Sequence, residues 1–289
     1  MLLKDIQTIF HNELDTENGA NEVNSFFNIL IKHYLSLNRI TLVLEPNLTL
    51  TKKEEEPLFE ALTRLKNKEP IQYIVGETEF YGLQFKVNEH TLIPRPETEE
   101  LVEEIINTII LGGEIKPLKI LDIGTGTGCI AISLAKTLKN AEVIAMDVSE
   151  EALKIAKENA RLNDVNITCI QDNILNPNNS LAEIEFKFDV IVSNPPYVRE
   201  VEKLEIKDNV LKHEPHLALF VPDDDPLKFY KAITAFAVDN LNDEGYLFFE
   251  INQYLGGEMK QLLADFNFKN IKVIKDVFGN DRITKALKP

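Results

Sequence analysis

The sequence has little cysteine, no long apolar segment and few basic residues for its acidic content. Its two cysteines, Cys129 and Cys169, lie far apart, which excludes a disulfide framework and a cysteine-rich zinc site and is typical of a reducing compartment. No apolar run approaches the roughly 20 residues that cross a bilayer. The segment Met1–Asp5 lacks the basic, apolar and small-residue regions of a signal peptide, so we expect a cytoplasmic protein with no membrane association.

The charge balance constrains the partners. The 289 residues include 31 basic and 47 acidic side chains, a formal net charge of −16. Duplex nucleic acid is bound mainly by Lys and Arg that neutralise phosphates, so we expect no direct binding of long nucleic acid. Net charge does not report how charge is distributed, so a local basic groove stays open, and the simplest interpretation of the acid excess is a solvated surface.

Histidine and cysteine give no sign of metal chemistry. Of the five histidines, His213 and His216 alone have a spacing that resembles metal ligands, and the single carboxylate between them, Glu214, does not complete a site. We therefore expect no metal. Cys129 follows a glycine turn, but we interpret it as a small buried residue that packs under a helix rather than as a nucleophile.

The apolar spacing divides the chain into parts. Residues 1–75 carry apolar side chains at helical intervals, which predicts a small helical domain. Residues 76–95 contain an aromatic, partly alternating stretch around Gly82, which predicts a β-hairpin linker. Residues 96–289 alternate between strand and helix patterns. Strands are expected at 119–122, 142–147, 167–171, 188–193 and 245–251, and helices at 128–138 and 149–162. This order predicts an α/β fold, a mostly parallel sheet with helices on both faces.

A glycine-rich turn follows the first of these strands. Its residues are Gly124, Thr125, Gly126, Thr127 and Gly128. The dinucleotide fingerprint G-x-G-x-x-G would require glycine at Cys129, and no Lys-Ser/Thr pair completes a P-loop. Asp147 ends the next strand, where a carboxylate accepts the hydroxyls of an adenosine ribose. Either feature alone could be a tight turn or a surface acid, but together they indicate nucleoside binding.

Asn194, Pro195, Pro196 and Tyr197 follow a very apolar strand and are the most informative motif. The two prolines fix φ and remove two N–H donors, which leaves an acceptor-rich corner made by the Asn194 side chain and the Pro195 carbonyl. Tyr197 adds an aromatic face. Two acceptors and a ring suit a planar NH₂ group, whose delocalised lone pair needs such help to attack a cationic methyl donor. For Asn173, an adenine contact and an ordinary polar turn are equally supported.

These motifs resemble those of class I S-adenosylmethionine-dependent methyltransferases. Three further stretches, Leu92–Glu99, Pro70–Gly76 and His213–Leu219, make nearly the whole chain similar to the peptide chain release factor N5-glutamine methyltransferase family, also called PrmC or HemK. Asn-Pro-Pro-Tyr is shared with adenine N6 methyltransferases, whereas Ile-Pro-Arg-Pro-Glu-Thr-Glu is not.

The resemblance implies a Rossmann-like, mostly parallel seven-stranded sheet and methyl transfer from S-adenosyl-L-methionine to the glutamine amide of the Gly-Gly-Gln motif in class 1 release factors. It places the 124–128 loop at the methionine part of the cofactor, Asp147 at the ribose and Asn173 near the adenine. Asn194 and Pro195 would hold the substrate amide, with Pro196 and Tyr197 completing the catalytic motif, and Asn194 would also border the cofactor. The N-terminal domain would hold the release factor, and we expect a monomer.

Two alternatives stay open. An amino methyltransferase acting on adenine N6 or guanine N2 would use nearly the same chemistry, but it needs a phosphate-binding surface that the charge of −16 does not favour. A non-catalytic cofactor-binding module would keep the glycine loop without the acceptor corner, and the intact Asn194–Tyr197 motif argues against it.

Overall fold

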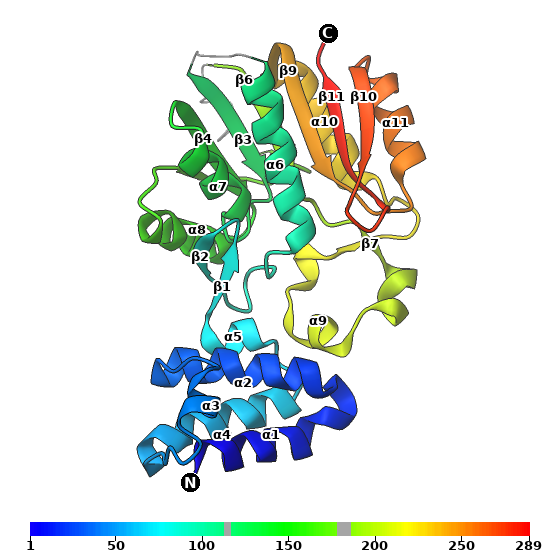
Figure 1. Ribbon diagram of the computed structural model, residues 1–289. Helices are drawn as coiled ribbons and strands as arrows, with labels where there is room; N and C mark the ends of the chain where they lie inside the picture. Colours follow the sequence, from blue (N-terminus) through cyan, green and yellow to red (C-terminus); the bar gives the residue numbers. More distant parts are fainter. Residues whose placement is uncertain (113–116, 178–185) are drawn as a thin grey trace. The chain divides into compact units, whose positions relative to one another are not determined.

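The computed structural model describes residues 1–112, 117–177 and 186–289, which form two compact units (Figure 1). The first unit comprises Met1–Gly76 and Lys207–His213, and the second comprises Glu77–Ile206 and Glu214–Pro289. The domain limits drawn from the sequence stay a prediction. The structural units differ from them because the hairpin belongs to the second unit and residues 207–213 to the first.

The first unit is helical, as the apolar spacing predicts. Its helices are α1 (Leu3–Asn18), α2 (Ala20–Leu35), α3 (Thr41–Leu44), α4 (Lys52–Lys66), α5 (Ile71–Val75) and α9 (Asp208–His213). The apolar faces of α1 and α2 meet where Phe10 packs edge-on against Phe27, with ring centroids 5.1 Å apart. Helix α9 joins this unit through the ion pair of Asp208 with Lys68, at 2.9 Å.

The second unit contains the alternating strands and helices. Its helices are α6 (Pro96–Leu111), α7 (Cys129–Thr137), α8 (Glu150–Leu162), α10 (Lys228–Asn240) and α11 (Gly256–Asp265), with the 3₁₀ turns η1 (Glu200–Glu205) and η2 (His216–Ala218). Its strands are β1 (Glu77–Phe80), β2 (Leu83–Lys86), β3 (Leu118–Ile123), β4 (Ala141–Asp147), β5 (Thr168–Gln171), β6 (Phe188–Ser193), β7 (Val198–Arg199), β8 (Phe220–Val221), β9 (Leu241–Glu250), β10 (Lys269–Lys275) and β11 (Asp281–Leu287). The predicted elements are confirmed, apart from β9, which begins earlier in the chain than expected.

The strands β1 and β2 pair as the expected hairpin, and seven others form one sheet in the order β10-β11-β9-β6-β3-β4-β5 (Figure 1). Strand β11 runs antiparallel to both of its neighbours, and the pairs among β9, β6, β3, β4 and β5 are parallel. The mostly parallel seven-stranded sheet is therefore confirmed. The chain adds β4 and then β5 on one side of β3 and crosses back to add β6 on the other side, and such a reversal opens a crevice at the carboxyl ends of these strands.

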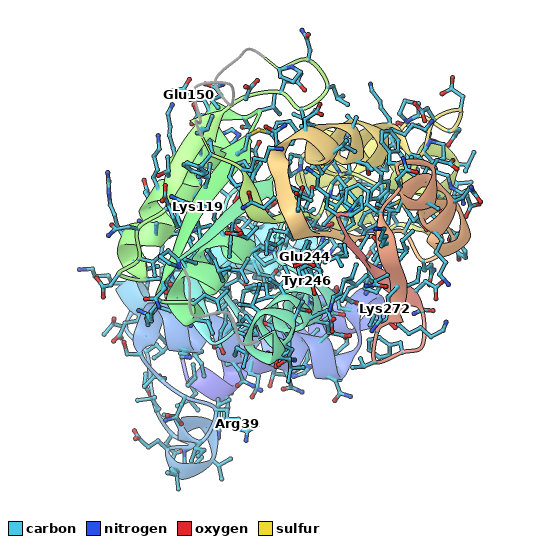
Figure 2. All side chains as sticks on the ribbon, turned by 90° about the horizontal axis from the view of Figure 1, so that it is seen from above. Arg39, Lys119, Glu150, Glu244, Tyr246 and Lys272 are labelled. Atoms are coloured by element: carbon cyan, nitrogen blue, oxygen red, sulfur yellow. The ribbon has the colours of Figure 1, made fainter. Side chains whose placement is uncertain are left out.

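Apolar side chains cover both faces of the sheet. Phe248 of β9 belongs to the core beneath α6 and α7, whereas Leu247 and Phe249 belong to the core beneath α10 and α11. This alternation is the two-residue period of a strand buried on both sides. Figure 2 shows side chains along the same sheet, including Lys119 of β3 and Tyr246 of β9. In the described part of the chain, no helix is both long enough and apolar enough to span a bilayer.

One buried amide ties the hairpin to the glycine turn. The side chain of Asn159 is fully buried on α8. Its Oδ1 accepts from the Lys86 backbone N–H at 2.7 Å, and its Nδ2 donates to the carbonyls of Lys86 and Thr127 at 3.0 and 2.9 Å. The bond to Thr127 is buried and the two bonds with Lys86 are partly buried, so the Asn159 amide satisfies polar groups that have limited access to water.

We expect Asn159→Ala to lower the free energy of unfolding by about 1–3 kcal/mol, because it removes the partner of the buried Thr127 carbonyl and of the partly buried N–H and carbonyl of Lys86. Urea unfolding followed by circular dichroism measures this. Lys157→Ala, at an exposed position of the same helix, is the control and should change stability by less than about 0.5 kcal/mol. Equal stabilities of the two variants would contradict the structural role of Asn159.

Candidate active site

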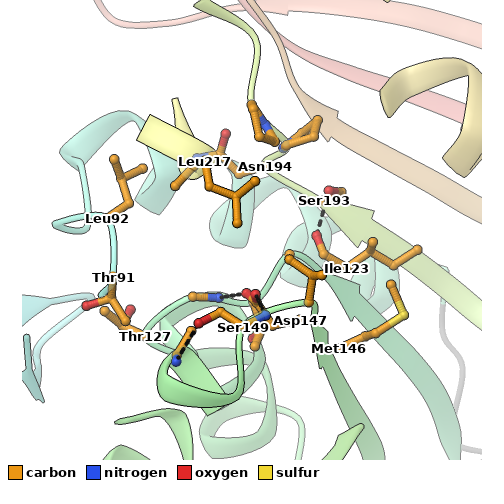
Figure 3. Close-up of a pocket in the computed structure, with 18 of the residues that line it drawn as sticks. Thr91, Leu92, Ile123, Thr127, Met146, Asp147, Ser149, Ser193, Asn194 and Leu217 are labelled. Atoms are coloured by element: carbon orange, nitrogen blue, oxygen red, sulfur yellow. Dashed lines mark hydrogen bonds between the residues drawn. The ribbon is translucent and has the colours of Figure 1, made fainter. Parts of the chain in front are cut away.

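A cavity of about 260 Å³ lies at the carboxyl ends of β3, β4 and β6 (Figure 3). Its lining includes most of the residues singled out from the sequence: Gly124, Thr125, Gly126, Thr127, Asp147, Asn173, Asn194, Pro195 and Pro196. In Figure 3, Asn194 and Leu217 lie on one side of the cavity, opposite Asp147 and Ser149. Gly128 and Tyr197 are not among the lining residues of this cavity. The fold thus brings together segments that are far apart in the sequence.

The glycine turn is held in a conformation that few other residues tolerate. Gly124, Gly126 and Gly128 have φ values of +74°, +55° and +80°. A Cβ on Gly128 would lie 3.2 Å from Ala156 Cβ and 3.0 Å from Ile132 Cδ1, so this glycine also allows α7 and α8 to approach each other. A Cβ on Gly126 would meet no atom within 4 Å, which leaves that side of the loop open. The loop therefore presents bare backbone to the cavity.

Asp147 fixes the same loop. Its Oδ2 accepts from the Gly126 N–H at 2.8 Å and its Oδ1 accepts from the Ser149 N–H at 2.9 Å. Burial raises the pKa of Asp147 above its usual value, and the backbone N–H groups of Ser149, Gly126 and Val148 offset part of that rise. A carboxylate has about four lone-pair positions, so Asp147 keeps acceptor capacity for two further donors from the cavity. Two free acceptor positions on one carboxylate match the two neighbouring hydroxyls of a vicinal diol.

A second acid, Asp122, lies beneath the loop and was missed by the sequence analysis. It is fully buried near the end of β3, where its Oδ2 accepts from the Thr125 hydroxyl at 2.6 Å and its Oδ1 has no hydrogen-bond partner among the described residues. Burial raises the pKa of Asp122 from 3.8 to about 7. An acid at the end of a buried strand was the available signal, but the sequence does not show that Thr125 turns back onto it.

Asn173 lines the cavity, but its side chain is also used locally. Its Oδ1 accepts from the Leu175 N–H at 3.0 Å, while its own N–H donates to Asp172 Oδ1 at 2.7 Å. The structure therefore contains the polar turn that was one of the two interpretations. An adenine contact for Asn173 stays a prediction. Apolar lining in the same cavity comes from Ile174 and Phe229.

The acceptor corner lies where two pockets meet. Asn194 and Pro195 line the large cavity and also a smaller pocket of about 60 Å³, whose lining includes Tyr197 and Glu250. The strand β6 ends at Ser193, whose hydroxyl donates to the Ile123 carbonyl at 2.6 Å and so fixes β6 against β3 (Figure 3). Asn194 is thereby placed between a large and a small space, which suits a transfer between two bound molecules.

A buried carboxylate is hydrogen-bonded to residues at this corner. Glu250, at the end of β9, is 1% exposed, and it accepts from Thr98 Oγ1 at 2.6 Å and from the Tyr197 hydroxyl at 3.0 Å. Asn194 Nδ2 in turn donates to Thr98 Oγ1 at 3.3 Å. The sequence analysis singled out neither Thr98 nor Glu250. The available signal for Glu250 was its place at the end of an apolar strand, on the same edge as Asp147 and Asn194.

Two distant motifs form one wall of the cavity. The Arg95 guanidinium pairs with the buried Glu214 carboxylate, which also accepts from the Ile93 N–H at 3.1 Å. This joins the Ile-Pro-Arg-Pro segment to the Glu-Pro-His-Leu segment, and Pro94 and Leu217 from the two segments line the cavity. The sequence places these residues more than a hundred positions apart and gives no sign of the pairing.

Cys129 is buried, as expected, and burial raises its pKa to about 12, so its thiol stays protonated at neutral pH. His213 Nε2 lies 3.1 Å from the Asn67 carbonyl, and His216 packs against the Phe220 ring. Across residues 1–112, 117–177 and 186–289, no cluster of three or more His, Cys, Asp or Glu side chains could hold a metal ion.

Several known proteins are similar to this chain in sequence. Two family models match it, the Methyltransferase small domain over residues 101–217 and the PrmC N-terminal domain over residues 15–76. A protein of Flavobacterium psychrophilum named release factor glutamine methyltransferase is 54% identical, with 99% of each chain covered. A protein of the same name from Bacteroides thetaiotaomicron is 42% identical, with 92% of each chain covered.

Two solved structures share the fold. The 16S rRNA N2 G1207 methyltransferase of T. thermophilus, solved with AdoMet and guanosine, has a TM-score of 0.52 at 18% identity, over 74% of this chain and 50% of that one. The methyltransferase domain of METTL16 has a TM-score of 0.51 at 20% identity, over 72% of this chain and 89% of that one. These likenesses show the class I methyltransferase fold.

The buried Asp122 predicts a pH-dependent stability. Its pKa is about 7 in the folded chain and about 3.9 when unfolded. Between these values the folded state binds more protons, so the free energy of unfolding falls as the pH rises. In Asp122→Asn this dependence is absent. From pH 5 to pH 8, the free energy of unfolding of wild type should therefore fall relative to that of the variant by roughly 2–3 kcal/mol. Urea unfolding without cofactor at both pH values checks this, and parallel changes in the two proteins would contradict it.

Proposed function

Because this chain belongs to the release factor glutamine methyltransferase family, we propose that it transfers the methyl group of S-adenosyl-L-methionine to the side-chain amide N5 of the glutamine in the GGQ motif of class 1 translation release factors. The observation that carries the proposal is the position of Asn194 and Pro195, which line both the large cavity and the small pocket. A methyl donor in one space and an amide in the other would meet at these two residues.

The large cavity fits S-adenosyl-L-methionine. The open side of the loop at Gly126 admits a ligand close to the backbone, and the remaining lone pairs of Asp147 suit the two ribose hydroxyls. Ile123, Ile174 and Phe229 offer apolar surface to a flat base. When bound, this cofactor supplies an electrophilic methyl group on a positively charged sulfur. The assignment of individual residues to its parts is ours.

The acceptor corner suits a carboxamide. The nitrogen of an amide is a poor nucleophile because its lone pair is delocalised into the carbonyl. Asn194 Oδ1 and the Pro195 carbonyl are both acceptors, so they would hold the two N–H bonds of the substrate amide and turn its lone pair toward the donor. Pro195 is buried and Pro196 follows it, which keeps this corner rigid and poor in competing donors. The proton lost by the product can leave after the methyl group has arrived.

The nucleic-acid alternative has less support. Relatives that are 54% and 42% identical to this chain carry the release factor name, and the rRNA enzyme among the structural neighbours shares only the fold at 18% identity. The net charge of −16 also gives little phosphate-binding capacity.

The remaining features of the proposal concern the whole molecule. The first unit would bind the release factor, since the PrmC N-terminal model covers residues 15–76, which lie within it. We also propose that the chain acts as a cytoplasmic monomer without binding long nucleic acid.

Incubation with a class 1 release factor and S-adenosyl-L-methionine tests the function. Mass spectrometry should find one added methyl group on the glutamine of the GGQ motif. A release factor with that glutamine replaced by alanine is the control and should take up no label. Methyl transfer to DNA or RNA alone, measured in parallel, would reverse the assignment.

Asn194→Ala should separate catalysis from cofactor binding. We expect turnover to fall by at least about 100-fold, because one of the two groups that hold the reacting amide is lost. Calorimetry should show largely unchanged affinity for S-adenosyl-L-methionine. Asn166→Ala, at an exposed position before β5, is a control that should keep full activity. Near-normal turnover in Asn194→Ala would eliminate the proposed role of this side chain.

A further inference from the structure

The acceptor corner is backed by a chain of buried hydrogen bonds. Thr98, in the first turn of α6, is 3% exposed and donates to Glu250 Oε2 at 2.6 Å. Asn194 Nδ2 donates to the same threonine oxygen at 3.3 Å. Tyr197 donates to the other oxygen of Glu250 at 3.0 Å. One carboxylate thus holds two members of the Asn-Pro-Pro-Tyr motif, one directly and one through a threonine.

The direction of these bonds follows from the number of hydrogens. A threonine hydroxyl has one hydrogen, and an ionised carboxylate can only accept. The hydrogen of Thr98 is therefore committed to Glu250, and its lone pairs are what it offers to Asn194. The asparagine can meet those lone pairs only with its NH₂ group, so its Oδ1 lies on the other branch of the planar amide. No donor from the described residues bonds this Oδ1, which leaves it available to a substrate.

The surroundings of Glu250 act on its pKa in opposite directions. Burial is the largest influence and raises the pKa of Glu250 above its usual value, while the bonds from Thr98 and Tyr197 and the positive charge of Arg282 offset part of that rise. Burial and the charge of Glu250 raise the pKa of Tyr197, so this phenol remains a donor at neutral pH. Arg282 is itself held by Asp276 at 3.2 Å. Both oxygens of the buried carboxylate therefore have side-chain donors.

We propose that Thr98 and Glu250 are positioning residues that set the polarity of the acceptor corner, by holding the Asn194 amide with its oxygen toward the substrate amide. The inference rests on the proposed function, since it concerns how the corner selects an NH₂ group. With the Asn194 amide reversed, its NH₂ would face the NH₂ of the substrate, and two donors would oppose each other.

We call the hydrogen-bonded series Glu250–Thr98–Asn194 the relay. Substitution of Thr98 tests it by steady-state kinetics with the release factor and S-adenosyl-L-methionine. Thr98→Val keeps the shape but removes the hydroxyl, and kcat should fall on the order of 10- to 100-fold. Thr98 also lines the large cavity, but the Kd for S-adenosyl-L-methionine should stay within about twofold of wild type, because the Thr98 hydroxyl is already engaged by Glu250 and Asn194. Thr98→Ser retains the hydroxyl and should restore kcat to within about fivefold.

The matched control lies on the same helix. Thr108 is also buried on α6, and its hydroxyl donates to the Glu104 carbonyl at 2.7 Å and is absent from the lining of both pockets. Thr108→Val removes the same atom from the same helix. It should leave kcat unchanged, so a loss confined to Thr98→Val is not a general effect of a missing hydroxyl on α6.

Glu250→Gln supplies an independent variant. A glutamine NH₂ can donate to Thr98, which frees the threonine hydrogen to face Asn194 and favours the reversed amide. We expect kcat to fall as far as in Thr98→Val. A neutral amide is easier to bury than a carboxylate, so the variant should unfold at a temperature no lower than wild type.

The possible results separate the relay from the proposed function. Full activity of Thr98→Val, equal loss in Thr98→Ser, or a parallel loss of cofactor affinity would each overturn the relay. If wild type itself does not methylate the release factor, the proposed function fails, and the relay is then judged by NMR of ¹⁵N-asparagine-labelled protein. The Asn194 side-chain NH₂ resonance, assigned with Asn194→Ala, should shift in Thr98→Val and not in Thr108→Val. An unshifted resonance in Thr98→Val would overturn the relay.

Discussion

The reversal of strand order beside β3 is the constraint on which the site depends. Parallel strands end at a common edge, and here the chain passes from β3 through β4 to β5 on one side and then returns to β6 on the other side of β3. The crevice between these directions is the place where a fold of this class binds its ligand. This crevice explains the positions of Asp147 and Asn194. Asp147 is the last residue of β4, Asn194 directly follows β6, and both strands border the crevice.

Three acids lie at the ends of β3, β4 and β9, the half-buried Asp147 and the buried Asp122 and Glu250, and each is held by a different set of donors. Asp147 is satisfied by backbone N–H groups and shapes the glycine loop. Asp122 accepts from the Thr125 hydroxyl, and its other oxygen has no hydrogen-bond partner within residues 1–112, 117–177 and 186–289. Glu250 receives two side-chain hydroxyls and acts on the acceptor corner through them. Burying a carboxylate is costly unless donors surround it, so each of these groups also restricts how its neighbours can move.

Much of the fold could be predicted from local patterns. The strands at 119–122 and 188–193 and the helix at 128–138 are marked by a high apolar content next to glycine or proline, and the structure confirms them. Strands β10 and β11 have weaker patterns, because they lie toward one edge of the sheet and carry many charged side chains. The inclusion of residues 207–213 in the first unit depends on contacts with Lys68 and Asn67, which no local pattern reveals.

The sequence by itself determined the chemistry that is available: a bare glycine loop, a carboxylate at the end of the next strand, and a proline-stiffened corner with acceptors. These are encoded in short contiguous motifs, because their conformations depend on local φ preferences and on strand ends. Only the tertiary structure decided which buried side chains are hydrogen-bonded to these motifs. Thr98, Asn194 and Glu250 come from three separate elements, and the direction of their hydrogen bonds depends on burial and on the single hydrogen of a hydroxyl, which exist as constraints only once the chain has folded.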